Sequence, residues 1–370
     1  MKLNWLNEAT QEISQDSIQA AKTRQNQLTK PSGSLGRMEE TAIQLAGMQH
    51  TDRPKIDNIH IAVFAADHGV AEDSVSAYPQ SVSVEMVRNF ANGGAAISVL
   101  AKEIDAKLEV VNVGTLTDPG YLAGVTSKRI GAGTANLGKQ AAMSDNQLME
   151  ALLIGRETVQ RANVNKLSLF IGGEMGIGNT TAATAIACAL LSELPEAVTG
   201  PGTGLDEQGV AHKSLIIKNA LELHKEHLVN PLEVLRRLGG FEIAALTGAY
   251  ISCAQMGIPV LVDGFISSVA ALVAIEHQLP VRNWLLFSHT SAEPGHAKVL
   301  NSLNVKPLLD LGMRLGEGSG AAIAVPQLRL ACALHNQMAT FSEAKVAKAN
   351  ISEAKVSKAK VSKAVVVKEV

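Results

Sequence analysis

The chain has 370 residues, of which 46% are apolar and only 18% charged, a composition that excludes a disordered protein and predicts a large buried core. Aromatic residues make up 3% of the chain and 31 residues are glycines, so Ala, Val, Ile and Leu must fill the core, which favours an α/β fold over an aromatic-rich β-sandwich. The net charge is −2, and the segment 343–370 holds seven Lys and three Glu, which leaves −6 on the rest of the chain and argues against nucleic-acid binding.

Three cysteines, Cys188, Cys253 and Cys332, lie far apart in segments rich in Ala, Leu and Ile. An odd number of cysteines in such surroundings is typical of buried thiols in a reducing compartment. The first eight residues contain no apolar run of the kind that a secretory signal needs. The best candidate for a membrane span, 258–275, is interrupted by Asp263 and two serines. We therefore expect a cytoplasmic protein without a membrane span.

Both ends of the chain are predicted to be helical, over 5–28, 37–50 and 318–337. The first two helices are separated by Lys30-Pro31-Ser32-Gly33-Ser34-Leu35-Gly36, whose proline and glycines exclude a continuous helix. We expect residues 1–52 and about 318–340 to pack together as a small helical lobe. Residues 53–317 would then form an α/β core.

Within that core, apolar β-branched segments alternate with segments of helical period. The predicted strands are 58–66, 108–114, 167–173, 258–264 and 284–288. The predicted helices lie around 81–104, 140–165, 178–192, 205–227, 241–257 and 264–278. Strands that are apolar throughout are typical of a parallel sheet with both faces covered. The alternation of strand and helix predicts such a sheet, joined by right-handed crossovers.

The last segment, 343–370, has a different composition, a near-repeat of Lys, Val, Ser and Ala with a spacing of five residues. This spacing carries the valines around a helix and from one face of a strand to the other, so neither element would gain a continuous apolar face. We expect a solvated, flexible tail. Its terminal Val365-Val366-Val367 could add transiently to a sheet edge.

Glycine-rich loops follow two of the predicted elements, and ligands of open parallel sheets bind at the carboxyl ends of the strands. The third predicted strand leads into Gly172-Gly173-Glu174-Met175-Gly176-Ile177-Gly178-Asn179-Thr180-Thr181 and a helix whose free amides and dipole suit a phosphate. This loop matches neither the Walker pattern nor a convincing dinucleotide-binding fingerprint. A second loop, Gly200-Pro201-Gly202-Thr203-Gly204-Leu205-Asp206, precedes a helix that carries Lys213. Together the loops predict a phosphate site with a cation nearby, although glycines that only permit close packing would have the same pattern.

A third glycine-rich segment, Arg314-Leu315-Gly316-Glu317-Gly318-Ser319-Gly320, places Glu317 directly before the final helix. A carboxylate flanked by glycines leaves room for a substrate and is a candidate general base. A glutamate in the first turn of a helix also complements the helix dipole, and the spacing leaves both interpretations open. Because the dipole lowers the pKa of a carboxyl group, a working base would need burial or a neighbouring acid to raise it.

In combination, these segments resemble one family, the nicotinate-nucleotide:dimethylbenzimidazole phosphoribosyltransferases. The resemblance covers about residues 1–340 and leaves out the Lys-rich tail. Besides the glycine-rich segments above and 30–36, it is carried by Ala66-Asp67-His68-Gly69-Val70, Tyr78-Pro79-Gln80, Gly93-Gly94-Ala95-Ala96-Ile97 and Asp263-Gly264-Phe265.

The resemblance implies a Rossmann-like parallel sheet, a small helical lobe from both chain ends, a homodimer, and an enzyme without a metal or redox cofactor. It implies that nicotinate mononucleotide and 5,6-dimethylbenzimidazole react to give α-ribazole 5′-phosphate and nicotinate, with inversion at the anomeric carbon. Glu317 matches the glutamate that takes the proton from the benzimidazole. The only partners expected besides a second copy of the chain are these small-molecule substrates.

The other site residues also come from the positions that match the family. Those expected to bind phosphate and ribose are Gly176, Gly178, Asn179, Thr180, Gly202, Thr203, Lys213 and Ser291. Those expected to form a flat apolar pocket for the base are Tyr78, Gln80, Met86, Arg88, Glu174, Met175 and Leu315. The two methionines suit an aromatic face because thioethers adapt to it. Gln80 and Arg88 are expected to influence which bases are accepted.

Two other functions remain open from the residues alone. A metal-dependent hydrolase would use acidic and histidine residues at strand exits, namely Asp67, His68, Asp263, His289 and His296, although none forms a typical pair of zinc ligands in the sequence. A non-catalytic protein that binds a phosphosugar or nucleotide would keep both phosphate loops but would not need Glu317.

Overall fold

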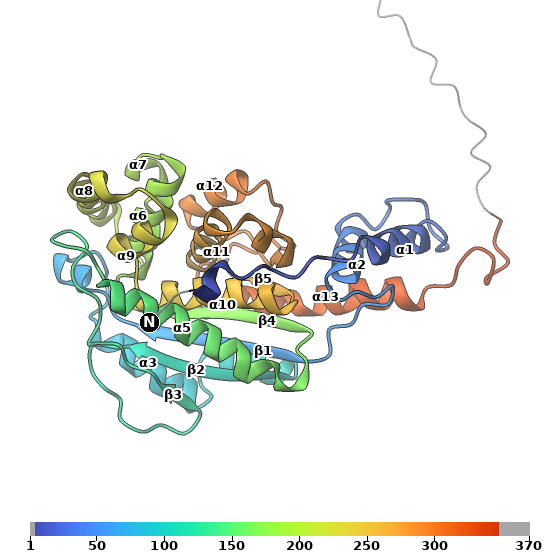
Figure 1. Cartoon of the computed structure of the whole chain (residues 1–370), viewed down its shortest axis with the longest axis horizontal. Coiled ribbons are helices and arrows are strands. Elements are labelled where there is room, and N and C mark those ends of the chain that lie inside the picture. The colour runs from blue at the N-terminus through green and yellow to red at the C-terminus, as the bar shows by residue number, and fades with distance from the viewer. Residues whose placement is uncertain (1–3, 348–370) are drawn as a thin grey trace, which may run out of the picture.

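The computed structural model describes residues 4–347. At its centre is a sheet in which all neighbouring strands are parallel, in the order β3-β2-β1-β4-β5-β6 (Figure 1). The strands are β1 Ile59–Ala66, β2 Ala106–Gly114, β3 Val125–Ser127, β4 Leu169–Met175, β5 Val260–Val262 and β6 Leu285–Phe287. This order is that of a Rossmann-like sheet, so the predicted fold class is confirmed.

The five strands that the sequence predicts, β1, β2, β4, β5 and β6, all contain continuous runs of buried residues. All eight residues of β1 are buried, as the continuous apolar run indicates. The sequence does not predict β3, which is three residues long, pairs only with Val110–Asn112 of β2 and is partly exposed. Its residues, Val125-Thr126-Ser127, contain no apolar run that would predict a strand, unlike those of the other edge strand, β6, which is also three residues long.

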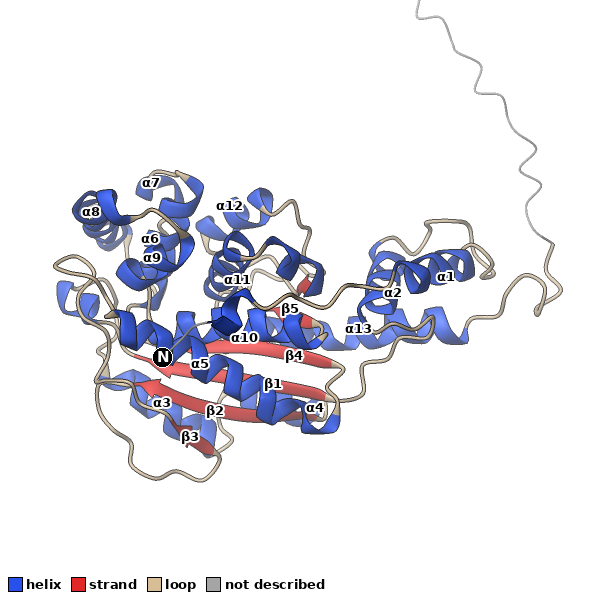
Figure 2. Cartoon of the chain, in the orientation of Figure 1, coloured by secondary structure: helices blue, strands red, loops and turns tan. Residues whose placement is uncertain are grey.

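Helices cover both faces of the sheet (Figure 2). The helices α5 and α10 lie over one face, and α3 and α4 lie over the other. The α-helices are α1 Gln15–Gln25, α2 Arg37–Met48, α3 Ser81–Ala91, α4 Ala96–Glu103, α5 Asp145–Ala162, α6 Asn179–Leu191, α7 Pro195–Val198, α8 Glu207–His224, α9 Pro231–Leu238, α10 Phe241–Met256, α11 Phe265–His277, α12 Pro294–Ser302 and α13 Ser319–Gln337.

Several helix boundaries differ from those predicted. The segment 81–104 is two helices, because the chain turns through Gly93, whose φ is 79°. The segment 5–28 contains a short 3-10 helix, Asn4–Asn7, and α1, which starts only after its N-cap Ser14. The sequence does not predict α9 and α12, which are eight and nine residues long and begin at prolines.

The two ends of the chain lie side by side. The helix α2 contacts both α1 and α13 (Figure 1). Arg24 of α1 donates hydrogen bonds to the carbonyls of His335, Asn336 and Met338 at the end of α13. The helix α13 also contacts β4 and α4, so it joins the terminal helices to the sheet. From residue 348 onward the segment predicted as a tail lies outside the described residues.

Small residues allow α5 and α10 to approach closely above the sheet. A Cβ at Gly155 of α5 would lie 2.7 Å from the amide nitrogen of Ala249 and would clash with the carbonyl of Ala245. A Cβ at Gly248 of α10 would clash with the carbonyl of Leu152. The abundance of glycine and scarcity of aromatic residues in the sequence therefore correspond to direct backbone contacts between helices.

We expect Gly155→Ala to lower the free energy of unfolding by about 1–3 kcal/mol, because the added methyl group must push α5 away from α10. Chemical denaturation measures this change. The control is Glu150→Ala, an exposed position on the same helix, which should change stability by less than about 0.5 kcal/mol. Equal stability of the two variants would contradict the close packing of these helices.

Candidate active site

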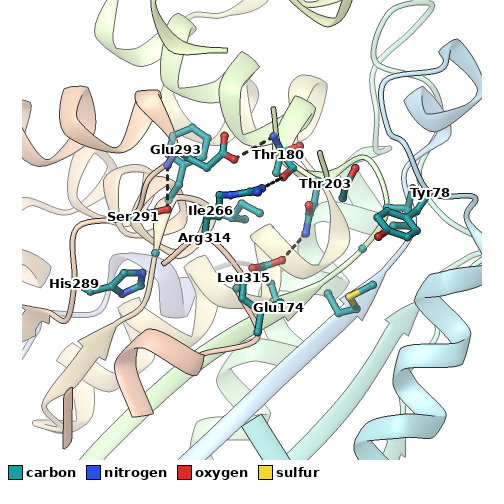
Figure 3. Close-up of a pocket in the computed structure, with 18 residues that line it drawn as sticks. Tyr78, Glu174, Thr180, Thr203, Ile266, His289, Ser291, Glu293, Arg314 and Leu315 are labelled. Carbon is teal, nitrogen blue, oxygen red and sulfur yellow. Dashed lines mark hydrogen bonds between the residues drawn. The ribbon is translucent and has the colours of Figure 1, made fainter. Parts of the chain in front are cut away.

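A cavity lies at the carboxyl ends of β4, β5 and β6, next to the point between β1 and β4 where the order of the strands reverses. In open α/β sheets, ligands bind in the crevice outside the carboxyl ends of the strands, at such a reversal point. The cavity has a volume of about 290 Å³ and opens to solvent (Figure 3). It is lined by Tyr78, Glu174, Met175, Gly176, Ile177, Asn179, Thr180, Gly202, Thr203, Gly264, Phe265, Ile266, His289, Ser291, Glu293, Arg314, Leu315 and Gly316.

The first wall of the cavity is the turn between β4 and α6. Gly176 lies against the carbonyl of Ala66 at the end of β1, where a Cβ would clash. Gly178, the N-cap of α6, has a φ of 99°, in the region that favours glycine. The turn brings Asn179 and Thr180, the first residues of α6, to the cavity. A helix N-terminus in this position can bind an anionic group such as phosphate.

The second wall is the loop 199–206, between α7 and α8. Gly202 and Gly204 have φ values of 52° and 108°. Thr203 Oγ1 lies 2.9 Å from Ser76 Oγ and accepts a hydrogen bond of 3.2 Å from the amide of Ala77. These bonds connect the second wall to the segment that carries Tyr78.

The cation predicted beside the phosphate loops lies one layer behind the second wall. Lys213 of α8 is only 1% exposed, and its Nζ donates to Thr180 Oγ1 at 2.7 Å and to the carbonyl of Gly200 at 3.4 Å. Burial lowers the pKa of Lys213 to about 8, and the carboxylate of Glu293 opposes this effect. Glu293 also accepts a hydrogen bond of 3.1 Å from the amide of Gly202. Hydrogen bonds of two buried side chains, Lys213 and Glu293, thus hold the second wall.

The other end of the cavity is apolar and partly open. Tyr78 and Leu315 are 55% and 58% exposed and line the cavity together with Met175. Glu174 is buried beside them, and its carboxylate accepts a hydrogen bond from the side chain of Asn179. Burial raises the pKa of Glu174 well above its ordinary value, which favours the protonated carboxyl. This end can hold a flat aromatic ring.

Glu317 lies in a strained turn beside the cavity. Three successive residues, Gly316, Glu317 and Gly318, have φ values of 88°, 64° and 84°, a conformation that is costly for a residue with a side chain. The buried carboxylate of Asp263, at the end of β5, accepts hydrogen bonds from the amides of Gly318 at 3.2 Å and Ala321 at 2.8 Å. These bonds hold the turn in place.

The environment of Glu317 is that of a base with a raised pKa. Its side chain is buried, and Oε2 lies 3.5 Å from the amide nitrogen of Ile97 at the start of α4. Burial raises the pKa of Glu317, the contact with Ile97 opposes this effect, and the charge of Asp263 adds to it. Because α13 begins only at Ser319, Glu317 is not a first-turn residue that complements the dipole of that helix.

The cavity brings most of the predicted site residues together. Those that line it are Tyr78, Glu174, Met175, Leu315, Gly176, Asn179, Thr180, Gly202, Thr203 and Ser291. Those outside the lining are Gly178, Lys213, Glu317, Gln80, Met86 and Arg88. Of these, Gln80 donates a hydrogen bond of 2.9 Å to the carbonyl of His68. Met86 and Arg88 belong to α3, with Met86 half-buried and Arg88 exposed.

Three charged or titratable lining residues are not among those predicted for the transferase site: Glu293 and Arg314, and His289, which the sequence offered only as a candidate metal ligand. His289 and Glu293 follow β6 within the polar exit His289-Thr290-Ser291-Ala292-Glu293, so their position after a strand was the signal that could have identified them. Arg314 directly precedes the segment of Glu317, and its Nη1 donates to the carbonyl of Gly202 at 3.2 Å. No pattern in the sequence reveals that contact.

Two further findings concern residues 4–347. No group of three or more His, Cys, Asp or Glu side chains there is arranged to hold a metal ion. In the same part of the chain, no helix has both the length and the apolar character that a membrane span requires.

Comparisons with known proteins give one consistent result. A family model described as "Phosphoribosyltransferase" matches residues 10–346. The nicotinate-nucleotide–dimethylbenzimidazole phosphoribosyltransferase of Pseudomonas putida strain GB-1 is 58% identical over 343 residues, which cover 93% of this chain and 98% of that protein. The protein of the same name from Xanthomonas euvesicatoria pv. vesicatoria strain 85-10 is 59% identical over 328 residues, 89% of this chain and 94% of the relative.

A solved structure agrees with these relatives. The crystal structure of the phosphoribosyltransferase of the same name from Thermus thermophilus superposes with a TM-score of 0.86 at 41% sequence identity, and the match covers 91% of this chain and 100% of that one. The relatives are named as transferases, which supports the transferase interpretation over the hydrolase. The chain therefore belongs to the family of nicotinate-nucleotide–dimethylbenzimidazole phosphoribosyltransferases, and it is an enzyme of the pentosyltransferase class.

Proposed function

We propose that this chain transfers the phosphoribosyl group of nicotinate mononucleotide to 5,6-dimethylbenzimidazole, giving α-ribazole 5′-phosphate and nicotinate. The observation that carries the proposal is a single cavity with two glycine-rich walls at one end, apolar side chains at the other, and Glu317 in the adjoining turn. The walls suit the phosphate of the nucleotide, the apolar end suits the benzimidazole, and the carboxylate suits the proton that must be removed.

The reaction needs one displacement and one proton transfer. A ring nitrogen of the benzimidazole uses its lone pair to form a bond to C1′ of the ribose. The bond from C1′ to the pyridinium nitrogen breaks, and its electron pair stays on the nicotinate ring, which becomes neutral and is therefore a good leaving group. The proton on the other benzimidazole nitrogen passes to the carboxylate of Glu317. Because the base enters opposite the leaving group, the configuration at C1′ inverts.

Binding of the phosphate fixes the ribose for this in-line attack. We assign the phosphate and ribose to Gly176, Asn179, Thr180, Gly202, Thr203 and Ser291, which line the walls, with Gly178 shaping the turn and Lys213 supplying positive charge from behind Thr180. Holding the reacting atoms in one geometry removes much of the entropic cost of the displacement. The walls therefore act in catalysis as well as in binding.

The base is assigned to the apolar end, where Tyr78, Met175 and Leu315 contact its faces and Glu174 lies at its edge. Gln80, Met86 and Arg88 do not line the cavity, so their proposed influence on the choice of base would act through the segment 78–88. For Gln80 this influence is supported by its hydrogen bond to the carbonyl of His68, which holds the residues next to Tyr78 against the end of β1.

If Glu317 is the base, Glu317→Gln should lower turnover by about a hundredfold to ten-thousandfold and leave nicotinate mononucleotide binding intact. Mass spectrometry of the products formed from nicotinate mononucleotide and dimethylbenzimidazole measures turnover, and calorimetry measures binding. Glu276→Gln, an exposed carboxylate on α11, is the control and should have no effect. Unchanged turnover in Glu317→Gln would contradict its role, and a wild-type chain that binds the nucleotide without product would indicate a non-catalytic phosphosugar-binding protein.

The pH dependence should have two limbs. On the acid side, kcat falls as Glu317 is protonated, at a pH above the ordinary range of a glutamate because burial raises its pKa. On the alkaline side, kcat/KM falls above about pH 8, because Lys213 loses its charge near the pKa of about 8 that burial gives it. The acid limb is read in kcat because the second phosphate ionisation of free substrate, at about pH 6, also affects kcat/KM.

Lys213→Arg separates these assignments. A guanidinium keeps its charge to about pH 12, so the alkaline limb should disappear from the profile of the variant while the acid limb stays in place. An alkaline limb that persists in Lys213→Arg would show that another group causes it.

We also propose that the enzyme works as a homodimer in the cytoplasm. The dimer is supported by the resemblance to the family, and the reducing compartment by three buried, unpaired cysteines, Cys188, Cys253 and Cys332. Sedimentation velocity at micromolar concentration should give twice the chain mass of 38.9 kDa. A monomer at that concentration would contradict the proposed assembly.

A further inference from the structure

One titratable side chain of the cavity has no role in the reaction as described above. His289, at the exit of β6, lines the cavity and is only 3% exposed. Its Nδ1 lies 3.0 Å from Ser288 Oγ and 3.9 Å from the carboxylate of Asp263. Its Nε2 has no hydrogen-bond partner among residues 4–347 and is not one of the atoms sealed from solvent. The free nitrogen is thus left for a ligand.

The ring of His289 is held in a fixed position. A Cβ at Gly320 would clash with the imidazole, and a Cβ at Gly264 would lie 3.4 Å from its Cε1 and 3.5 Å from its Nε2. The two glycines therefore leave room for the ring, and the hydrogen bond to Ser288 fixes its Nδ1 edge. A side chain held by packing and by a hydrogen bond on one edge is suited to precise contact with a ligand on the other.

In-line displacement determines which substrate group lies near this ring. The entering base and the departing nicotinate must lie on opposite sides of C1′. Figure 3 shows Tyr78 and His289 at opposite margins of the cavity, with Thr180, Ser291 and Glu293 along the rim between them. With the base at Tyr78 and the phosphate at the rim, the nicotinate ring points toward His289.

We propose that His289 binds the carboxylate of the departing nicotinate and makes the enzyme select nicotinate mononucleotide over nicotinamide mononucleotide. This inference rests on the proposed function. An imidazole nitrogen can donate a hydrogen bond, and here the Nε2–H would donate to the substrate carboxylate while the Nδ1 edge faces Ser288 and Asp263. The neutral amide of nicotinamide offers no charge to match. A charge-assisted hydrogen bond of this kind discriminates more strongly than a neutral one.

Arg314, which also lines the cavity, contacts the second wall. Its guanidinium donates a hydrogen bond to the carbonyl of Gly202 in that wall. Burial raises the pKa of Glu293, and the charges of Lys213 and Arg314 oppose this effect, so Arg314 belongs to the phosphate end. Both mononucleotides carry the same phosphate. Replacing Arg314 should therefore weaken the binding of both mononucleotides equally, which makes Arg314 the matched control for His289.

The test compares kcat/KM for nicotinate mononucleotide and nicotinamide mononucleotide, each with dimethylbenzimidazole, in the wild type, His289→Asn, His289→Gln and Arg314→Gln. We expect both His289 variants to lower kcat/KM for nicotinate mononucleotide by about tenfold to a hundredfold and to leave kcat/KM for nicotinamide mononucleotide unchanged. The ratio of the first constant to the second should fall by the same factor. Arg314→Gln should lower both constants and keep the ratio. An equal loss for both substrates in the His289 variants would overturn the inference.

Product inhibition of the wild type gives an answer that does not depend on the folding of a variant. Nicotinate should inhibit at least about tenfold more tightly than nicotinamide, because only nicotinate carries the carboxylate. Equal inhibition by the two compounds would overturn the inference while leaving the proposed function intact. Absence of product from either mononucleotide in the wild type would instead overturn the proposed function, and the inference with it.

Discussion

The contact on which the site depends is that between the buried carboxylate of Asp263 and the start of α13. Asp263 accepts hydrogen bonds from the amides of Gly318 and Ala321 and so holds the end of β5 to the turn that carries Glu317. The backbone of this turn lies against β4 at Gly173, where a Cβ would clash with it. These contacts together stabilise the positive φ of Glu317, a conformation that costs on the order of 1–3 kcal/mol and persists only where the surroundings enforce it.

Burial creates three carboxyl groups with raised pKa values at the site, Glu174, Asp263 and Glu317, and their hydrogen bonds give them different tasks. Asp263 accepts hydrogen bonds from two amides, and these bonds favour its charged form. Asp263 is therefore suited to a structural role as an anion. Among residues 4–347, the carboxylate of Glu317 has only the long contact to the amide of Ile97. Protonation is therefore more favourable for Glu317 than for Asp263. This difference supports the assignment of Glu317 as the general base.

The sequence predicts those parts of the fold and site that depend on local pattern. Buried parallel strands are continuous apolar runs, and positions that need a positive φ or a close backbone approach, such as Gly176 and Gly178, are glycines. Contacts between loops that are far apart in the chain leave no local pattern in the sequence. The sequence places Lys213 near the phosphate loops, but its contact with Thr180 depends on how α8 packs. The contact of Arg314 with Gly202 depends likewise on how the segment before α13 packs, so neither contact could be predicted.

Charge balance connects the two ends of the cavity. During the displacement the positive charge leaves the pyridinium and appears on the benzimidazole, where loss of a proton to Glu317 removes it. The departing nicotinate keeps its carboxylate, which then lacks the positive partner within its own ring. The Nε2–H of His289 would supply a hydrogen-bond partner for this carboxylate, and Asp263 lies 3.9 Å from the Nδ1 of the same ring. Asp263, which positions the turn of Glu317, would thus also lie beside the imidazole of His289 that binds the departing nicotinate.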